Sequence, residues 1–259
     1  MSELADICVV AVAEAFRGDG EIFASGMGTI PMLGARLARA TFEPDLLVSD
    51  GEAFFVDGDL AIGGTEKIGT DKIGGAERVV EGWVPFRSVF DTLWAGRRHV
   101  VMGASQLDRH ANQNIASIGP WQRPKSQLLG VRGAPGNTAN HATSYWVPNH
   151  TARVFVDHVD MVSGIGYERA RQAGPWVAAH HDIRRVITNK AVIDFEAPGH
   201  AARLRSVHPG VTVDEVIALT GFDLVVPAEV APSRELTDDE RAALGRLDPE
   251  GLRHREVRP

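Results

Sequence analysis

A hydroxyl and two carboxylates follow a short apolar run near residue 50. Leu46-Leu47-Val48 predicts a short buried strand, and it leads directly into Ser49, Asp50, Gly51 and Glu52. A carboxylate at such a strand end can attack an acyl carbonyl and form a covalent intermediate. Asp50 also fits a turn residue that bonds its own backbone, and Ser49 lacks the G-x-S-x-G elbow of a hydrolase nucleophile. Ser49, Asp50 and Glu52 are therefore candidates for catalysis, and the turn interpretation stays open.

A glycine turn precedes a predicted helix earlier in the chain. Gly26 and Gly28 lead into a first turn that suits Pro31, because the missing N–H of proline is not needed there. Such a turn presents free N–H groups and the positive end of the helix dipole to an anion or an oxyanion. Pro31 stands at the third glycine position of a dinucleotide fingerprint, which disfavours a nicotinamide site. Gly26 and Gly28 are candidate ligand-binding residues, and a tight turn without a ligand is the alternative.

A second glycine-rich segment extends from Gly130 to Asn140. Glycines at 130, 133 and 136 allow the backbone to approach a ligand closely, and Arg132 and Asn137 can donate hydrogen bonds there. Gly130, Arg132, Gly133 and Asn137 are therefore candidate binding residues. The alternative is a surface arginine on a mobile loop.

The elements that position these candidates follow from hydrophobic periodicity. Residues 3–17 predict an amphipathic helix, residues 21–25 a strand, and residues from Pro31 onward a second helix before the strand at 46–48. Strand, helix and strand at this spacing predict a βαβ unit and a parallel sheet. The glycine-rich residues 58–82 predict loops or short hairpins. Further strands are predicted at 99–102, 126–129, 153–162, 184–195 and 224–226, and a helix with a Thr212/Glu215 capping box begins at Thr212.

The composition predicts one large α/β domain over residues 1–227. Beyond Pro227 the chain becomes rich in Pro, Arg, Asp and Glu, with a second capping box at Thr237 and Glu240. Residues 228–259 are expected to form a short helix and an extended arm that lies on the same domain or on a partner.

Charge and cysteine content exclude several classes of partner. The 259 residues carry a formal net charge of -7, so no basic excess exists to neutralise nucleic-acid phosphates or an anionic membrane. The single cysteine, Cys8, suits a reducing cytoplasm, and the acidic N-terminus lacks the basic region of a signal peptide. The longest apolar run, Ile7 to Ala13, is much shorter than a membrane span. The ten histidines show no metal-binding spacing, so no metal is expected.

Several segments together resemble the β subunit of the class I coenzyme A transferases, with the glutaconate type as the nearest match. Aligned on Gly51, the position that holds the nucleophilic glutamate in that family carries Ser49 here, with Asp50 next to it. Arg132 stands where that family usually has a glycine. The segments that carry the resemblance are Ser25–Pro31, Gly103–Asp108, Asn114–Gly119, Gly130–Asn137, His208–Val216 and Thr220–Phe222.

The resemblance implies an open, mostly parallel α/β sheet with flanking helices, of the NagB/RpiA/CoA transferase-like kind. It also implies an α subunit on a separate polypeptide, an α2β2 assembly, and coenzyme A as part of the substrate rather than a permanent cofactor. Gly26 and Gly28 would then contact the acyl or CoA part of the substrate. Arg132 would hold the carboxylate of an acidic substrate in a changed pocket.

One branch of this family has lost the glutamate, and the chain resembles the β subunit of that branch. Its members are two-subunit hydrolases that open the last steroid rings in actinobacterial cholesterol degradation. The implied reaction is a hydrolytic retro-Claisen cleavage of a cyclic β-keto acyl-CoA. It needs a general base, expected mainly from the partner, and oxyanion donors, but no protein acyl intermediate.

Two other functions stay open. One is an ordinary CoA transferase acting on a small dicarboxylate or 3-oxoacid, with Asp50 or Glu52 as an unusual nucleophile. The other is a non-catalytic subunit that stabilises its partner.

Overall fold

A computed structural model describes residues 2–49, 54–58, 61–62, 72–73, 76–77 and 79–257 of the chain. The chain divides into two compact units. Unit 1 comprises residues 1–101 and 234–259, and unit 2 comprises residues 102–233. The expected division into a domain ending at residue 227 and a separate tail stays a prediction.

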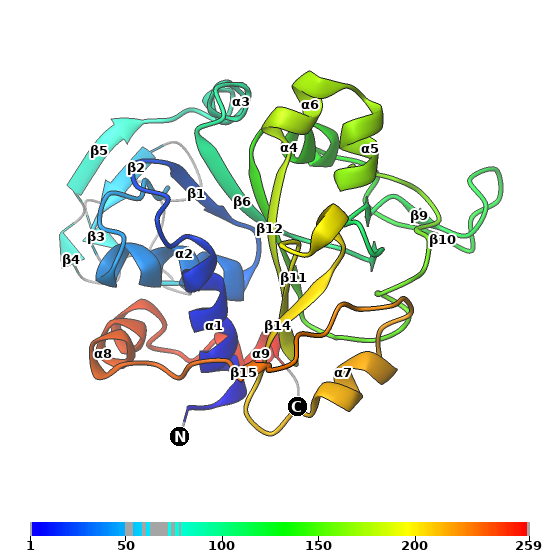
Figure 1. The fold of residues 1–259 in the computed structure, drawn as a ribbon. Helices are drawn as coiled ribbons and strands as arrows, with labels where there is room; N and C mark the ends of the chain where they lie inside the picture. The colour runs from blue at the N-terminus through cyan, green and yellow to red at the C-terminus, as the bar shows by residue number, and fades with distance from the viewer. Residues whose placement is uncertain are drawn as a thin grey trace. The chain divides into compact units, whose positions relative to one another are not determined.

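Two long helices form the core of unit 1. Helix α1 (Leu4–Ala15) confirms the predicted helix, but it is apolar on nearly every side and buries ten of its twelve residues, so it is not amphipathic. Helix α2 (Thr29–Thr41) crosses α1 so closely that a Cβ at Gly34 would lie 2.4 Å from Cγ1 of Val12. Figure 1 shows α1 and α2 side by side, with α8 (Asp238–Leu247) next to α2.

The sheet strands of unit 1 follow the predicted βαβ order. Strand β1 (Phe23–Gly26) pairs in parallel with β6 (Arg98–Gly103), so that Phe23 lies opposite Arg98. Residues 46–48 follow α2 and reach β1 through a single parallel bridge between Leu47 and Phe23. The expected strand at 46–48 is thus present only as a bridge, held by the N–H of Ala24 and the carbonyl of Leu47 at 2.9 Å.

Short elements complete unit 1. The expected hairpins are confirmed where the structure describes them, and the tail contains the expected helix α8, whose start carries the reciprocal Thr237/Glu240 capping box. The remaining elements are β2 (Phe54–Asp57), which pairs with β5 (Val79–Trp83), β3 (Lys72–Ile73), which pairs with β4 (Ala76–Glu77), and the helices α3 (Ser88–Trp94) and α9 (Arg253–Glu256).

Unit 2 contains a sheet in the order β11, β12, β13, β14, β15. The pairs β11–β12 and β14–β15 are parallel, and the pairs β12–β13 and β13–β14 are antiparallel. The strand predicted at 184–195 is divided at residues 189–190 into two strands, β12 and β13, which pair as a hairpin. The strands are β11 (Ala142–Val147), β12 (Asp182–Thr188), β13 (Ala191–Asp194), β14 (Arg203–Val207) and β15 (Ala231–Pro232).

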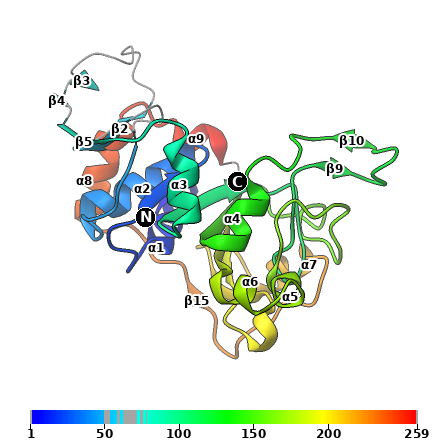
Figure 2. The same ribbon diagram turned by 90° about the horizontal axis from the view of Figure 1, so that it is seen from above.

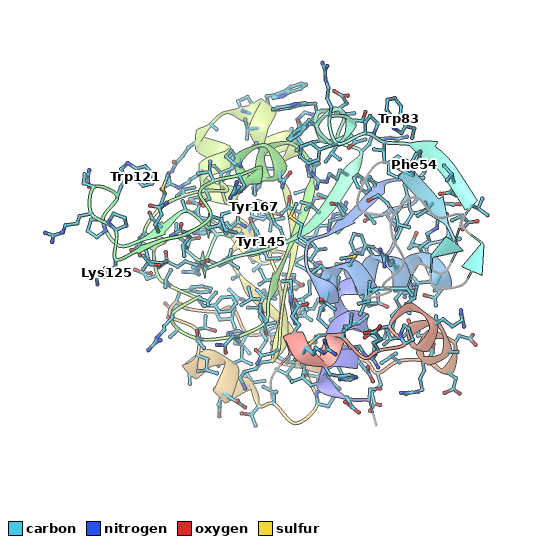
Figure 3. The ribbon with its side chains drawn as sticks, turned by 180° about the vertical axis from the view of Figure 1, so that it is seen from behind. Phe54, Trp83, Trp121, Lys125, Tyr145 and Tyr167 are labelled. Atoms are coloured by element: carbon cyan, nitrogen blue, oxygen red, sulfur yellow. The ribbon has the colours of Figure 1, made fainter. Side chains whose placement is uncertain are left out.

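Helices and hairpins surround this sheet within unit 2. Figures 1 and 2 both show the β9–β10 hairpin projecting from the rest of the unit, and Figure 3 places Trp121 and Lys125 on that projection. The helices are α4 (Ala134–Asn140), α5 (Tyr167–Gln172), α6 (Pro175–His180), the 3₁₀ turn η1 (Pro198–His200) and α7 (Val213–Ala218). The hairpins pair β7 (Gln106–Leu107) with β8 (Gln113–Asn114) and β9 (Ser117–Ile118) with β10 (Ser126–Gln127).

Two predicted strands of unit 2 are wrong, and one predicted capping box is incomplete. Residues 153–162 form turns with one bridge at Phe155, because the carbonyl of Thr151 accepts two N–H groups and the carboxylate of Asp160 holds Gln106 and Gly119. The expected buried strand at 126–129 is the short, exposed β10. The Thr212/Glu215 capping box is half formed: Thr212 caps α7, while the carboxylate of Glu215 bonds Lys190 instead.

The fold class expected from the sequence is confirmed. Apart from the short two-stranded pairs, three strand pairs are parallel (β1–β6, β11–β12 and β14–β15) and two are antiparallel (β12–β13 and β13–β14), and helices flank the strands in each unit. Among the residues that the structure describes, no helix has both the length and the apolar character that crossing a membrane requires.

Candidate functional site

A cavity of about 100 Å³ lies at the carboxyl end of β1, inside unit 1. Ligands commonly bind at the carboxyl ends of strands in open α/β sheets. The cavity brings together Gly26 and Ser49, which the sequence predicted as a binding and a catalytic residue. Its walls are Phe23, Ala24, Ser25, Gly26, Met32, Ala35, Arg36, Val48 and Ser49.

Gly26 is required by the close packing between β1 and α2. An added Cβ would lie 2.4 Å from the backbone carbonyl carbon and oxygen of Pro31, a separation that no real side chain tolerates. The N–H of Met27 donates to the carbonyl of Val101 at 2.9 Å, and Gly28 follows with a φ of +118°. The turn from Gly26 to Gly28 therefore has a fixed backbone, and the half-exposed side chain of Met27 lies on its outer side.

The start of α2 is occupied by a carboxylate from the same chain. Oε2 of Glu256 accepts the N–H of Ile30 at 3.1 Å. The sequence predicted that the N–H groups here face an anion, and the structure supplies that anion from α9. A ligand role for Gly26 and Gly28 stays a prediction.

Two buried arginines accompany this cavity, and sequence reasoning missed both. Arg36 lines the cavity with only 9% of its surface exposed. Nη2 of Arg98 donates to Oγ of Ser25 at 2.8 Å, and burial lowers the pKa of Arg98 to about 10. Both guanidinium groups carry a positive charge at neutral pH. A clue in the sequence was Arg36 within the apolar run from Leu33 to Ala38.

Of the three catalytic candidates, only Ser49 lies within the residues that the structure describes. Ser49 lines the cavity and forms an antiparallel bridge with Phe55. Asp50 and Glu52 lie outside the described residues. Their proposed roles therefore stay predictions.

The Gly130–Asn140 segment is a turn followed by a helix rather than a loop. Gly130 has a φ of +78° and Arg132 a φ of +49°, and α4 begins immediately after Gly133. Pro135 lies in the first turn of α4, where proline is well tolerated. Arg132 is exposed, whereas Asn137 is buried, with Nδ2 3.5 Å from Sδ of Met102. These two predicted donors therefore do not share an exposed face.

A buried polar network lies elsewhere in unit 2. Nδ2 of Asn112 donates to Oδ2 of Asp108 at 2.8 Å and to Oε1 of Glu168 at 2.6 Å. Burial raises the pKa of Asp108, the negative charge of Glu168 adds to this, and hydrogen bonds from Asn112 and His110 oppose it. Burial raises the pKa of Tyr145, which is labelled in Figure 3, and the negative charge of Asp108 adds to this. The contacts of this network hold loops together, which is a structural task.

Two buried histidines of unit 2, His150 and His208, are hydrogen-bonded and have lowered pKa values. Burial lowers the pKa of His150 to about 3 and that of His208 to about 4. His208 bonds Oγ of Ser233 and the carbonyl of Thr188, each at 2.8 Å. Among the described residues, no group of three or more His, Cys, Asp or Glu side chains is arranged to hold a metal ion.

Comparison with known proteins links these features to an enzyme family. The profile of the family described as Coenzyme A transferase matches residues 7–219. The cholesterol ring-cleaving hydrolase IpdB subunit of Rhodococcus jostii (strain RHA1) is 50% identical over 254 residues, covering 98% of this chain and 95% of that protein. The subunit of the same name from Mycobacterium tuberculosis (strain ATCC 25618 / H37Rv) is 49% identical over 259 residues, covering 100% of both. The crystal structure of Rhodococcus jostii RHA1 IpdAB has a TM-score of 0.90 and 49% identity, covering 100% of this chain and 99% of that one.

Proposed function

Because this chain belongs to the coenzyme A transferase family, we propose that it is the β subunit of a two-subunit acyl-CoA hydrolase. Its substrate is a cyclic β-keto acyl-CoA from steroid degradation, and the enzyme opens the ring by cleaving a carbon–carbon bond. The observation that carries the proposal is near-half identity, over almost the whole chain, to subunits named cholesterol ring-cleaving hydrolase. The serine at position 49, where the transferases it resembles have a glutamate, agrees with this choice.

The proposed reaction is a hydrolytic retro-Claisen cleavage. A general base removes a proton from water, and the water oxygen adds to the ring ketone. The tetrahedral intermediate collapses to a carboxylic acid as the bond to the carbon next to the thioester breaks. That electron pair becomes a thioester enolate, which a proton then quenches. Coenzyme A stays attached throughout, so no carboxylate of this chain has to attack the thioester.

The cavity at the end of β1 is suited to negative charge that develops during this reaction. Arg36 and Arg98 supply positive charge in a buried setting, where it acts more strongly than in water. Gly26 forms part of the cavity wall, and Gly28, Gly130 and Gly133 are proposed to contact coenzyme A. Arg132 pairs with a carboxylate of the acyl group.

The general base comes from an α subunit, in an assembly of composition α2β2. Exposed aromatic side chains between residues 83 and 94 of unit 1 support the need for a partner, since exposed apolar surface marks interaction sites. Trp83, Phe86 and Trp94 expose 72%, 74% and 69% of their surfaces. Coenzyme A enters only as part of the substrate. The single cysteine, which is buried, suits a reducing cytoplasm.

The products of the purified two-subunit complex test this function. Incubation with a cyclic β-keto acyl-CoA should give a ring-opened acyl-CoA heavier by one water, with no free coenzyme A. The Ser49→Ala variant should keep turnover within about tenfold of the unsubstituted complex, because no acyl-serine forms. Transfer of coenzyme A to an added dicarboxylate, abolished by Glu52→Gln, would establish the transferase alternative instead. Unchanged turnover on substitution of Ser49, Arg132 and Asn137 would favour a scaffold subunit.

A further inference from the structure

The C-terminal segment of the chain folds back onto the turn that forms part of the cavity wall. Helix α9 ends at Glu256, whose Oε2 accepts the N–H of Ile30 in the first turn of α2 at 3.1 Å. The two residues are 226 positions apart in the sequence. Figure 1 shows α9, coloured red, close to the blue α1, and α9 contacts both α1 and α2.

Ion pairs fix the position of α9 in unit 1. Nε of Arg253 donates to Oδ1 of Asp6 at 2.7 Å, and Nη1 donates to Oδ2 of Asp248 at 2.9 Å. Both carboxylates have side chains that are at least nine-tenths buried. The N–H of Leu252 donates to Oδ1 of Asp248 at 2.7 Å. These contacts hold α9 in place, and α9 in turn places the carboxylate of Glu256 at the start of α2.

The sequence of α2 explains why it needs this carboxylate. Gly28 occupies the N-cap position and has no side chain to bond the first N–H groups, and the first turn contains no acidic residue. An N-cap carboxylate normally satisfies these groups and complements the positive end of the helix dipole. Gly28 also leaves room for the carboxylate of Glu256, because a Cβ at position 28 would lie only 3.3 Å from Oε1 of Glu256.

We propose that Glu256 is a positioning residue that holds the Gly26–Gly28 turn in the shape that receives the acyl-CoA substrate. It acts through Ile30 and Gly28 and touches neither the cavity nor the reacting atoms. The same turn passes directly from β1 into α2, so any shift of the first turn of α2 moves the wall at Gly26. The inference rests on the proposed function only for the identity of the ligand.

Three variants of the two-subunit complex test the proposal. Glu256→Ala removes the cap, whereas Glu256→Gln keeps an oxygen that can accept the N–H of Ile30. Glu250→Ala is the matched control, because it removes an exposed glutamate from the same tail. Glu256→Ala should raise KM for the cyclic acyl-CoA about fivefold or more while kcat changes less than about twofold. Glu256→Gln should restore KM to within about twofold of the original complex, and Glu250→Ala should leave it unchanged.

Two measurements on the same proteins do not depend on the reaction. Hydrogen exchange over residues 27–33 should be faster in Glu256→Ala than in Glu256→Gln and Glu250→Ala. Calorimetry with coenzyme A alone should show weaker binding for Glu256→Ala. If exchange and coenzyme A affinity are unchanged, or if KM falls in Glu256→Ala, Glu256 does not position this turn. An inactive complex that still shows both effects would overturn the proposed reaction and leave the role of Glu256 intact.

Discussion

The side chains around the cavity determine which reaction the scaffold can support. Ser49 and Ser25 offer hydroxyls, and Arg36 and Arg98 offer buried positive charge. A charge fixed in a buried site stabilises a developing oxyanion without reorganisation, which suits attack by water. Sequence reasoning listed Gly26 and Ser49, which line this cavity, as candidates, but it did not list Arg36, Arg98 or Glu256. Those three are recognisable only from burial and from contacts between distant residues, which spacing along a chain does not reveal.

Arg132 provides a test in which stability and binding should change in opposite directions. Its φ of +49° is a backbone conformation that glycine adopts without strain, and Arg132 is exposed. Arg132→Gly should therefore raise the free energy of unfolding by up to about 1 kcal/mol. If Arg132 holds a substrate carboxylate, the same variant should raise KM about tenfold or more. Chemical denaturation and steady-state kinetics measure the two effects, and an unchanged KM would remove Arg132 from the binding site.

Helices were predicted correctly from the sequence where the residues that signal them lie close together in the chain. The apolar pattern of α1 and the reciprocal capping box of α8 both lie within a few neighbouring residues, and both helices are confirmed. Strand β11 was missed because its six residues are all buried, which removes the alternation that marks a strand, and because Thr143 and Ser144 are polar. Helix α4 was missed because Pro135 and Gly136 resemble a turn. Such cases are decided by tertiary packing, which overrides local preference.

The junction between β1 and α2 should be intolerant of any side chain at Gly26. A methyl group there meets the backbone of Pro31 at 2.4 Å, so Gly26→Ala should lower the free energy of unfolding by about 2 kcal/mol or more. Gly245→Ala is the control, since no described atom lies within 4 Å of the added carbon in α8. That substitution should stabilise the protein by about 0.5–1 kcal/mol. Thermal and urea denaturation of both variants measure the difference, and equal stabilities would contradict the close packing.

The β13–β14 pair contains a buried ion pair with a predictable response to pH. Asp194 is fully buried and lies opposite Arg203, which donates to both of its oxygens at 2.8 Å. Burial alone would raise the pKa of Asp194, but the hydrogen bonds and charge of Arg203 outweigh it and lower that pKa below its ordinary value. A carboxyl group with a lowered folded-state pKa stabilises the fold above its unfolded-state pKa. That stability is lost as the pH falls through the folded-state pKa.

Arg203→Met should therefore lower the free energy of unfolding by about 2 kcal/mol at pH 7. This is less than for a fully buried pair because Arg203 is partly exposed. The difference from the unsubstituted protein should shrink as the pH falls from about 4, the ordinary pKa of an aspartate, through the lower folded-state pKa of Asp194. Arg205→Met, whose guanidinium is more exposed and lies 3.4 Å from the same carboxylate, should have a smaller effect. Urea denaturation between pH 7 and pH 3 measures these differences, and a pH-independent difference would exclude the ion pair as its source.

For the whole molecule, the sequence indicated an enzyme that is incomplete without a second chain. The described residues place buried arginines beside the cavity, yet the proposed general base lies on the partner. Exposed aromatic residues such as Trp83 and Phe86 agree with a surface that another chain covers. Family membership and fold could be recognised from the order of short motifs along the chain. The ring structure of the substrate could not be predicted from the sequence. It is selected by the shape of the pocket, and that shape depends on both subunits.

The decisive measurement follows the oxygen of water through one turnover of the two-subunit complex. In water enriched with oxygen-18, a cyclic β-keto acyl-CoA should yield a ring-opened product that carries one labelled oxygen in its new carboxylate and none in its intact thioester. A coenzyme A adduct on an acidic residue of this chain, trapped with hydroxylamine or borohydride and located by mass spectrometry, would contradict attack by water.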